Sequence, residues 1–426
     1  MSTSPFYPRA AEPRLLEALD DTPVVLIHGP RQCGKTTLAL GVAESRGYAY
    51  FTFDDAVTLE SASTDPVTFV NDLPEKVVLD EVQRVPGIFT ALKSVVDRAR
   101  QPGRFLLTGS SNVLLIPTLA DSLAGRMGIL RLHPLARCEI ERSAPAFLDN
   151  LFRAGFKAGR AERLHRKLAE LIVAGGYPAA LARSTTRRRA AWYRDYIETL
   201  VQRDVRSLAR IASLDALPRL LALAAGQTAR LINVSELAGP FQLSRPTIRD
   251  YLTLLERVFL LEQLPPWHSN RLSRLIKTPK LHLGDSGVAS ALLNYDPDSL
   301  WEDRPLLGQL LETFVLQELR RQASSHEDEI RFHHFRDKEG AEVDIVLEIG
   351  SGRVAGVEVK AAATVDRRDF RGMEKLQSAS KMRFTYGVVL YDGETCTRFG
   401  EQLYAVPIRY LWEPGAGRSA TRDRRK

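Results

Sequence analysis

The sequence has few cysteines and no long apolar run, and both absences narrow the possible classes of protein. Its 426 residues include three cysteines, Cys33, Cys138 and Cys396, which are far apart and odd in number. This pattern argues against a disulfide framework and a cysteine-rich metal site. No stretch approaches the roughly 20 apolar residues of a transmembrane helix, and the N-terminus lacks a signal-peptide pattern. We therefore expect a cytoplasmic protein that makes no membrane contact.

The composition is that of a globular protein with several domains. Hydrophobic residues make up 44% of the chain and charged residues 26%, which is enough apolar material for buried cores. The length fits about two to four domains. The net charge of +7 is compatible with binding a phosphate backbone, but clustered arginines are also common on solvated helix faces. Charge alone therefore leaves a nucleic-acid partner open.

Residues 29–36, Gly-Pro-Arg-Gln-Cys-Gly-Lys-Thr, form a complete GxxxxGK[ST] phosphate loop. An apolar run at 24–27 precedes the loop and a helix-forming segment follows it, so strand, loop and helix occur in the required order. Backbone N–H groups at the start of such a helix bind phosphate oxygens. Lys35 supplies charge to the terminal phosphates, and Thr36 supplies a hydroxyl for Mg²⁺. The sequence therefore predicts a site for ATP and Mg²⁺.

A second strand ending in acidic residues supplies the other half of this site. The strand-like run 76–79 leads into Asp80 and Glu81, which read as a Walker B motif. Asp80 is expected in the Mg²⁺ shell, and Glu81 is expected to polarise the attacking water. A third strand at 104–108 leads into Gly-Ser-Ser-Asn, which either senses the γ-phosphate or forms a plain polar turn. The predicted nucleotide-binding residues are Gly29, Pro30, Arg31, Gln32, Cys33, Gly34, Lys35, Thr36, Thr37, Asp80 and Ser111.

Two residues of this region have alternative interpretations. Arg126, in the segment Leu-Ala-Gly-Arg, is a candidate for stabilising transition-state charge in its own subunit or a neighbour's. An exposed arginine in an ion pair explains it equally well. Cys33 lies near Lys35 at a helix N-terminus, where a thiolate is favoured. If so, alkylation should block nucleotide binding and ATP should protect; otherwise Cys33 merely fills a variable loop position.

From about residue 140 the alternation of strands and helices stops. Residues 164–183 and 188–208 read as long amphipathic helices, which we interpret as a helical lid or connector. Residues 217–264 then follow the order helix, helix, capped helix and hairpin, which is typical of a winged helix-turn-helix.

The third helix of this module begins at a plausible N-cap, Ser244. If the module reads DNA, Arg245, Thr247 and Arg249 near the start of that helix would contact it. Many such modules serve only as joints between proteins, so both interpretations stay open.

The C-terminal region has a second group of chemically active residues. Helix, three strands, helix and strand follow one another between 307 and 391, an αβββαβ order. Asp344 and the pair Glu358 and Lys360 have the spacing of a PD-(D/E)xK nuclease core. Two carboxylates on adjacent strands can hold a divalent metal, while the lysine orients the hydrolytic water. Glu312 on the preceding helix could add a carboxylate. Alternating charges on an exposed strand face are the other explanation.

Several motifs together resemble a known family. GPRQCGKTT, VVLDEVQ, LLTGSSN and LAGR, followed by LGDSGVASALL, EVDIVLE and GVEVK, are similar to those of prokaryotic AAA-type (AAA+) ATPases. In this family the C-terminal half is a domain of unknown function with a restriction-endonuclease-like core. The resemblance spans about residues 13–391 and implies an AAA+ fold that uses ATP and Mg²⁺. It assigns ATPase roles to Lys35, Thr36, Asp80 and Glu81, and nuclease-like roles to Glu312, Asp344, Glu358 and Lys360.

These observations predict an α/β protein in which a P-loop AAA+ parallel sheet precedes a helical and winged-helix segment and a nuclease-like domain. The predicted domains are an ATPase domain at 1–138, a helical connector at 139–212, a winged-helix-like domain at 213–300, a nuclease-like domain at 301–412 and a disordered basic tail at 413–426. The predicted catalytic residues are Glu81, Lys35, Arg126 and Lys360, and the predicted metal ligands are Thr36, Asp80, Glu312, Asp344 and Glu358.

Two functions follow from this organisation. In the first, ATP hydrolysis controls a C-terminal domain that binds or cleaves DNA, where a second divalent metal would act. In the second, the chain is a nucleotide-dependent switch that binds a protein partner, and the nuclease-like core is catalytically idle. Oligomerisation is compatible with both.

Overall fold

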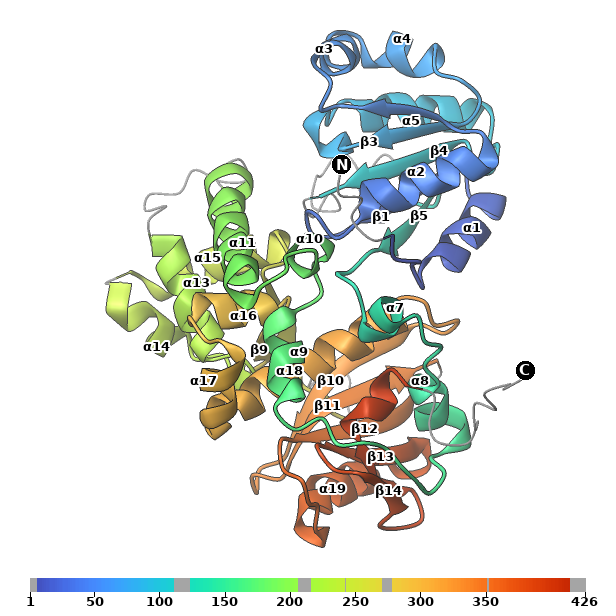
Figure 1. Ribbon diagram of the computed structural model, residues 1–426. Helices are drawn as coiled ribbons and strands as arrows, with labels where there is room; N and C mark the ends of the chain where they lie inside the picture. Colours follow the sequence, from blue (N-terminus) through green and yellow to red (C-terminus); the bar gives the residue numbers. More distant parts are fainter. Residues whose placement is uncertain are drawn as a thin grey trace, which may run out of the picture. The chain divides into compact units, whose positions relative to one another are not determined.

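The computed structural model describes residues 6–110, 123–205, 216–241, 243–269, 278–350 and 352–413. These residues fall into two compact units. The first unit runs to Leu135 and adds Tyr177–Ala179 and Leu254–Phe259, and the second unit holds the rest of the chain. Figure 1 labels the helices and strands of both units.

The first unit is built on a parallel sheet with the strand order β2-β3-β4-β1-β5. Its strands are β1 (Val24–His28), β2 (Ala49–Thr52), β3 (Val77–Asp80), β4 (Phe105–Gly109) and β5 (Met127–Arg131). Its helices are α1 (Glu12–Asp21), α2 (Lys35–Arg46), α3 (Ala56–Thr64), α4 (Pro66–Asn71) and α5 (Ile88–Arg98), with a 3₁₀ turn at Val82–Arg84. The alternation of strands and helices predicted from the sequence is confirmed.

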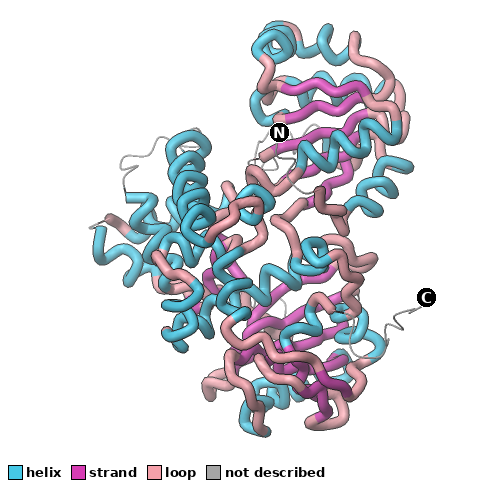
Figure 2. The backbone as a smooth tube through the Cα atoms, viewed as in Figure 1, coloured by secondary structure: helices cyan, strands magenta, loops and turns pink. Residues whose placement is uncertain are grey.

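Helices cover both faces of this sheet. Val25 and Ile27 of β1 share a buried cluster with residues of α1 and α2, whereas Val24 and Leu26 pack on the opposite side with residues of α4 and α5. Successive side chains of a strand point to opposite faces, so a strand buried on both sides must be apolar throughout. This explains the uninterrupted apolar run before the phosphate loop, and Figure 2 shows the strands of this unit enclosed by helices.

The helices of the second unit are shorter than the sequence pattern predicts. The expected helix at 164–183 is interrupted, because the chain turns at Gly175, where φ is +63°. The helices are α7 (Arg137–Glu141), α8 (Phe147–Asp149), α9 (Lys167–Ala174), α10 (Pro178–Leu181, partly in the first unit), α11 (Thr186–Thr199), α13 (Ala216–Gly226), α14 (Val234–Ala238), α15 (Arg245–Arg257, partly in the first unit), α16 (Ser286–Leu292), α17 (Pro297–Glu302), α18 (Arg304–Ala323) and α19 (Arg371–Ser380).

Within this unit, α13, α14 and α15 precede a small antiparallel sheet with the order β7-β9-β8. Its strands are β7 (Arg230–Leu231), β8 (Leu261–Leu264) and β9 (Lys280–Leu283). The hydroxyl of Ser244 accepts a hydrogen bond from the N–H of Thr247 at 3.2 Å, so Ser244 caps α15 as expected. The order of the three helices matches the prediction, but β7 between α13 and α14 was not predicted, and β9, which pairs with β8, lies beyond the predicted segment 217–264.

A larger sheet follows, with the order β10-β11-β12-β13-β15-β14-β6. The strands are β6 (Gly159–Arg160), β10 (Ile330–Arg336), β11 (Glu342–Ile349), β12 (Arg353–Lys360), β13 (Phe384–Tyr391), β14 (Thr395–Arg398) and β15 (Leu403–Pro407). Strands β10, β11 and β12 are antiparallel, whereas β13 runs parallel to β12. With α18 before β10 and α19 before β13, the chain follows the predicted αβββαβ order. The additional strands β6, β14 and β15 were not predicted.

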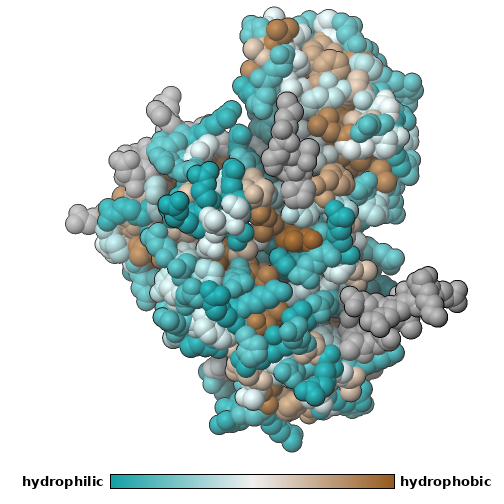
Figure 3. All heavy atoms as spheres, viewed as in Figure 1, coloured by the Kyte–Doolittle hydropathy of each residue, from teal (hydrophilic) through white to brown (hydrophobic). Residues whose placement is uncertain are grey.

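The visible surface is mainly hydrophilic, with scattered hydrophobic patches (Figure 3). Large exposed apolar side chains include Val57, Val67, Ile129 and Met382, which lie on different elements. Among the helices of the described ranges, none combines the length and the apolar character needed to cross a membrane.

Candidate functional site

The phosphate loop connects β1 to α2 and depends on two glycines. A Cβ on Gly29 would lie 2.0 Å from the carbonyl oxygen of Leu132, so a side chain there would clash with backbone. Gly34 has φ of +102°, which glycine adopts without the strain that a side chain would cause, and α2 begins immediately after it. The loop therefore places its backbone at the N-terminus of a helix, where N–H groups bind anions.

Lys35 lies buried inside this loop. Its Nζ donates to the carbonyl oxygens of Gly29 and Pro30, at 3.0 Å and 2.8 Å. Both acceptors are neutral, so these contacts position the ammonium without cancelling its charge. A lysine held in this way is suited to pair with the phosphates of a nucleotide.

Thr36 and Asp80 lie side by side, although 44 residues separate them. The hydroxyl of Thr36 donates to both carboxylate oxygens of Asp80, at 3.0 Å and 3.2 Å. Thr108, on the intervening strand β4, also donates to Asp80, and so does the hydroxyl of Tyr50 at 2.9 Å. Burial, together with this bond to Asp80, raises the pKa of Tyr50 to about 12. Hydroxyl and carboxylate oxygens are the ligands that Mg²⁺ prefers, so the pair fits the metal.

Glu81 follows Asp80 in a left-handed conformation, with φ of +61°. One of its carboxylate oxygens accepts a hydrogen bond from the hydroxyl of Ser110 at 2.9 Å and another from the amide of Gln83. Ser110, directly after β4, is thus the polar side chain that contacts Glu81 in the segment Gly-Ser-Ser-Asn. The predicted Ser111 lies outside the described residues.

Arg9 is a residue of this site that the sequence interpretation missed. Its guanidinium donates to the carbonyl oxygens of Cys33 and His133, each at 2.7 Å. Arg9 therefore links the N-terminal segment to the phosphate loop and to the residues that follow β5. Nothing local marks Arg9 in the sequence, because its partners lie 24 and 124 residues away.

The Cys33 side chain belongs to the core. It is fully buried among apolar residues, and its Sγ contacts the carbonyl oxygen of Leu132 at 3.4 Å. The thiol therefore packs in the core of the first unit, and the effect of alkylating Cys33 on nucleotide binding stays a prediction.

Two further residues of the first unit, His28 and Arg126, have different surroundings. His28 ends β1, where burial, assisted by the charges of Arg131 and Lys35, lowers its pKa to about 4. Arg126 forms an ion pair with Asp97 of α5 and also donates to the carbonyl oxygen of Ala124 at 3.1 Å. Arg126 is thus in the ion-paired arrangement, whereas the hydrogen bonds described above for the side chains of Asp80 and Glu81 come from other residues.

In the second unit, two of the predicted metal ligands, Glu312 and Asp344, contact a lysine that the sequence interpretation missed, together with Glu342, which was not predicted. The Nζ of Lys280, on β9, lies 2.9 Å from Glu312, 2.6 Å from Glu342 and 3.2 Å from Asp344. The side chain of Lys280 is 3% exposed. Burial alone would lower its pKa, but the three carboxylates raise it well above the ordinary value. We call these four residues the Lys280 cluster.

The remaining predicted nuclease-like residues adjoin this cluster. Lys360 donates to Glu358 at 2.8 Å, and the second oxygen of Asp344 accepts a hydrogen bond from the N–H of Val359 at 3.0 Å. Burial and the neighbouring Asp344 raise the pKa of Glu358 to about 8. The structure therefore brings Asp344, Glu358 and Lys360 together. Within the described ranges, however, no group of three or more His, Cys, Asp or Glu residues is arranged to hold a metal ion.

Comparisons with known proteins agree with this organisation. Residues 21–141 match the AAA domain family, and residues 165–299 and 307–411 match two domains of unknown function, DUF8612 and DUF4143. The uncharacterized proteins Rv2008c of Mycobacterium tuberculosis and Mb2031c of Mycobacterium bovis are each 30% identical over 410 residues, covering 96% of this chain and 85% of theirs. This chain belongs to their family. With its AAA domain, it is an AAA-type ATPase.

Solved structures show weaker similarity to this AAA-type ATPase. The Walker-type ATPase PABY2304 of Pyrococcus abyssi shares 14% identity at a TM-score of 0.42, covering 66% of this chain and 94% of that one. The Thermotoga maritima RuvB Holliday junction branch migration motor shares 18% identity at a TM-score of 0.30, covering 60% of this chain and 89% of that one.

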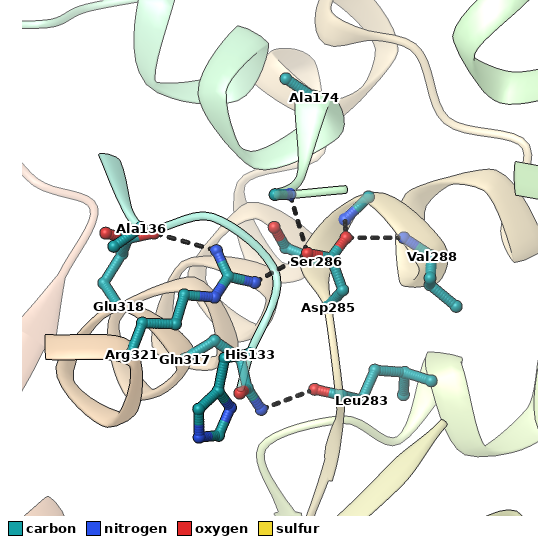
Figure 4. Close-up of polar contacts among 12 residues, drawn as sticks. His133, Ala136, Ala174, Leu283, Asp285, Ser286, Val288, Gln317, Glu318 and Arg321 are labelled. Atoms are coloured by element: carbon teal, nitrogen blue, oxygen red, sulfur yellow. Dashed lines mark hydrogen bonds and ion pairs between the residues drawn. The ribbon is translucent and has the colours of Figure 1, made fainter. Parts of the chain in front are cut away.

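The LGDSG motif of this AAA-type ATPase belongs to a buried ionic network (Figure 4). Asp285 caps α16 and accepts hydrogen bonds from the N–H groups of Gly287 and Gly176, at 2.9 Å and 2.8 Å. Arg321 of α18 bridges Asp285, at 2.7 Å, and Glu318, at 3.0 Å. Because Arg321 joins α16 to α18, the motif is explained by packing within the second unit.

Glu318 extends the same network to the start of α7. Its second oxygen accepts a hydrogen bond from the N–H of Arg137 at 2.8 Å. Burial raises the pKa of Glu318, whereas the charge of Arg321 opposes that rise. The residues that open the second unit are therefore attached to its central helix α18.

Proposed function

We propose that this AAA-type ATPase hydrolyses ATP at the phosphate loop and uses the nucleotide state to control its C-terminal half. The observation that carries the proposal is the contact between the Thr36 hydroxyl and the Asp80 carboxylate, beside the buried ammonium of Lys35. Three groups that a magnesium nucleotide needs are thereby assembled from two distant segments of the chain.

Each residue has a distinct role in this proposal. The backbone of residues 29–34 and the ammonium of Lys35 would bind the phosphates, while Thr36 and Asp80 would hold Mg²⁺, which neutralises phosphate charge. Glu81 would orient a water molecule and accept its proton as that water attacks the γ-phosphorus and the bond to the β-phosphate breaks. Glu81 must first exchange its contacts with Gln83 and Ser110 for that water.

Arg126 is the candidate for stabilising charge in the transition state, either within its own chain or in a neighbouring subunit. This role requires Arg126 to leave Asp97. An Arg126→Ala variant that turns ATP over normally at every protein concentration would remove Arg126 from the mechanism.

For the C-terminal half, the first candidate output is action on DNA. The αβββαβ order and the juxtaposition of Asp344, Glu358 and Lys360 support a restriction-endonuclease-like core. The capped helix α15, followed by two antiparallel strands, supports a winged-helix module, and Arg245 and Arg249 are exposed near the start of that helix. In this form of the proposal α15 contacts DNA.

The second candidate is a nucleotide-dependent switch whose nuclease-like core is idle and whose C-terminal half binds a protein. The Lys280 cluster favours this candidate, because the carboxylates that would hold a second metal already contact an ammonium. Both candidates share the same ATPase.

The deciding experiment measures ATP turnover with and without single-stranded, duplex and branched DNA, and metal-dependent cleavage of the same DNA. Glu81→Gln should retain ATP binding and lose turnover. Stimulation by one form of DNA that weakens steeply with salt supports DNA as the partner. Cleavage that is lost in Asp344→Ala and Lys360→Ala while ATPase persists supports the nuclease. No stimulation and no cleavage supports the switch. A protein that binds no magnesium nucleotide contradicts the whole proposal.

A further inference from the structure

The acidic residues of the nuclease-like core are arranged around a cation that belongs to the protein itself. Metal nucleases of this order hold a divalent cation between carboxylates on adjacent strands. Here Lys280 Nζ lies within 3.2 Å of oxygen atoms from Glu312, Glu342 and Asp344. An ammonium has three donors, so three carboxylate oxygens satisfy it completely.

A divalent metal does not fit the same place. Mg²⁺ and Ca²⁺ need several oxygen ligands at about 2.0–2.6 Å, and they cannot approach oxygens that already surround a buried ammonium. The second oxygen of Asp344 is also occupied, by the N–H of Val359 at 3.0 Å. Of the two oxygens of Glu358, Oε1 contacts Lys360.

The position of Lys280 is fixed by its strand and by the burial of its side chain. It lies on β9, the middle strand of its sheet, with partners Leu231 and Leu264 on the two neighbouring strands. Its side chain is 3% exposed, and removing an ammonium from three carboxylates would leave their charges buried and unpaired. A metal ion would have to displace a group that the fold itself supplies.

We propose that Lys280 permanently replaces the divalent metal in this core, so that the C-terminal domain neither takes up metal at Asp344 nor cleaves nucleic acid. The carboxylates instead join β9, in the small sheet that follows α13, α14 and α15, to α18 and to β11 of the large sheet. The inference rests on the nuclease-like core proposed above and is independent of the ATPase.

The test uses the full-length protein, Mn²⁺ alone and no nucleotide. Electron paramagnetic resonance should detect the same amount of bound Mn²⁺ in wild type and in Asp344→Asn, because no Mn²⁺ binds at Asp344. In Lys280→Met, whose side chain is one heavy atom shorter and carries no charge, Mn²⁺ at a concentration of 100 times its dissociation constant should raise the thermal midpoint by about 5–10 °C. The double variant with Asp344→Asn should lose that response.

Each outcome is informative. An Asp344-dependent equivalent of Mn²⁺ in wild type overturns the inference, and this arm does not require the Lys280 variant to fold. A folded Lys280→Met protein with no Mn²⁺ response also overturns it, because the carboxylates would then not form a metal-type site. Failure of the ATPase proposal would appear separately, as absent ATP turnover, and would leave both metal measurements unchanged.

Discussion

Two buried lysines in this protein have opposite environments, and the difference separates a site built to receive a ligand from one that is already complete. Lys35 contacts neutral carbonyl oxygens, and in the described part of the chain the hydrogen-bond partners of nearby Asp80 are hydroxyl groups. Lys280 contacts three carboxylates directly. At the phosphate loop the ammonium of Lys35 and the carboxylate of Asp80 have separate neutral partners until a magnesium nucleotide joins them, whereas in the Lys280 cluster the opposite charges neutralise each other.

The largest predicted effect concerns the first lysine. Lys35→Met should weaken ATP binding by at least about 100-fold, because it removes the charge that pairs with the phosphates. The free energy of unfolding should fall by only about 1 kcal/mol, since the lost hydrogen bonds are to neutral carbonyls. Calorimetric titration with ATP and Mg²⁺ measures the first quantity, and urea unfolding measures the second. A variant that binds ATP as wild type does would contradict the comparison.

The matched change in the second unit should reverse this result. Lys280→Met should lower the free energy of unfolding by about 3–5 kcal/mol, because it leaves carboxylates buried without their cation. ATP binding should be unchanged. Tryptophan fluorescence follows this unit selectively, since the four tryptophans of the sequence, Trp192, Trp267, Trp301 and Trp412, all belong to it.

Lys360→Met is the control for this substitution. The Lys360 side chain is 35% exposed and pairs with Glu358, so its loss should cost about 1 kcal/mol or less after solvent screening. If the free energy of unfolding fell equally in Lys280→Met and Lys360→Met, burial would not explain the contribution of Lys280 to stability.

A smaller effect should appear as a pH dependence of the second unit. Burial, followed by the charge of Lys280, lowers the pKa of His334 to about 4 from an ordinary value of 6.5. The unfolded chain therefore binds a proton between pH 6.5 and 4 that the folded chain does not. His334 thus contributes stability above pH 6.5 that is lost as pH falls towards 4, by at most about 3 kcal/mol.

The comparison of His334→Gln with wild type isolates this contribution from the other titrating groups. Urea unfolding followed by tryptophan fluorescence should show a shallower loss of stability on acidification in the variant. His28→Gln is the matched control in the first unit, and it should leave the fluorescence-detected slope unchanged. An identical slope in wild type and His334→Gln would show that folding does not lower the pKa of His334.

The smallest predicted effect tests the hydroxyl partners of Asp80. Tyr50→Phe removes a hydrogen bond of 2.9 Å, but Thr36 and Thr108 remain. ATP affinity should change by less than about threefold, because Mg²⁺ depends on the carboxylate itself. Thr36→Val, measured in the same titration, should have the larger effect. The reverse order would place Tyr50, and not Thr36, in the metal shell.

How much the sequence could predict depends on how far apart the interacting residues lie. The phosphate loop is contiguous, so Gly29 to Thr36 could be identified from spacing alone, and Asp80 from the strand before it. The αβββαβ order was predictable because each element has its own hydrophobic period. Ser110 follows β4 and contacts Glu81. Ser111, which the sequence analysis named as a nucleotide-binding residue, lies outside the described residues and stays a prediction.

The Lys280 cluster could not be predicted in this way. Its contacts join Lys280 to residues 32 and 64 positions along the chain, on different elements. The carboxylates alone suggest a metal site, and only the tertiary structure supplies the ammonium between them. One signal was present: Lys280 lies in the segment Lys-Leu-His-Leu, whose four residues are all buried, and a lysine in such a strand needs a partner. The short strands β6, β14 and β15 carried too little periodicity to be recognised.

The burial of every thiol has a practical consequence for following the ATPase cycle. Cys33, Cys138 and Cys396 are all buried, and burial raises the pKa of Cys138 to about 12 and that of Cys396 to about 11. Maleimide dyes should therefore react slowly with the native chain. One cysteine introduced on the surface of each unit would give a doubly labelled molecule without removing any natural cysteine, and energy transfer between the dyes would report any change in the distance between them as nucleotide binds and leaves.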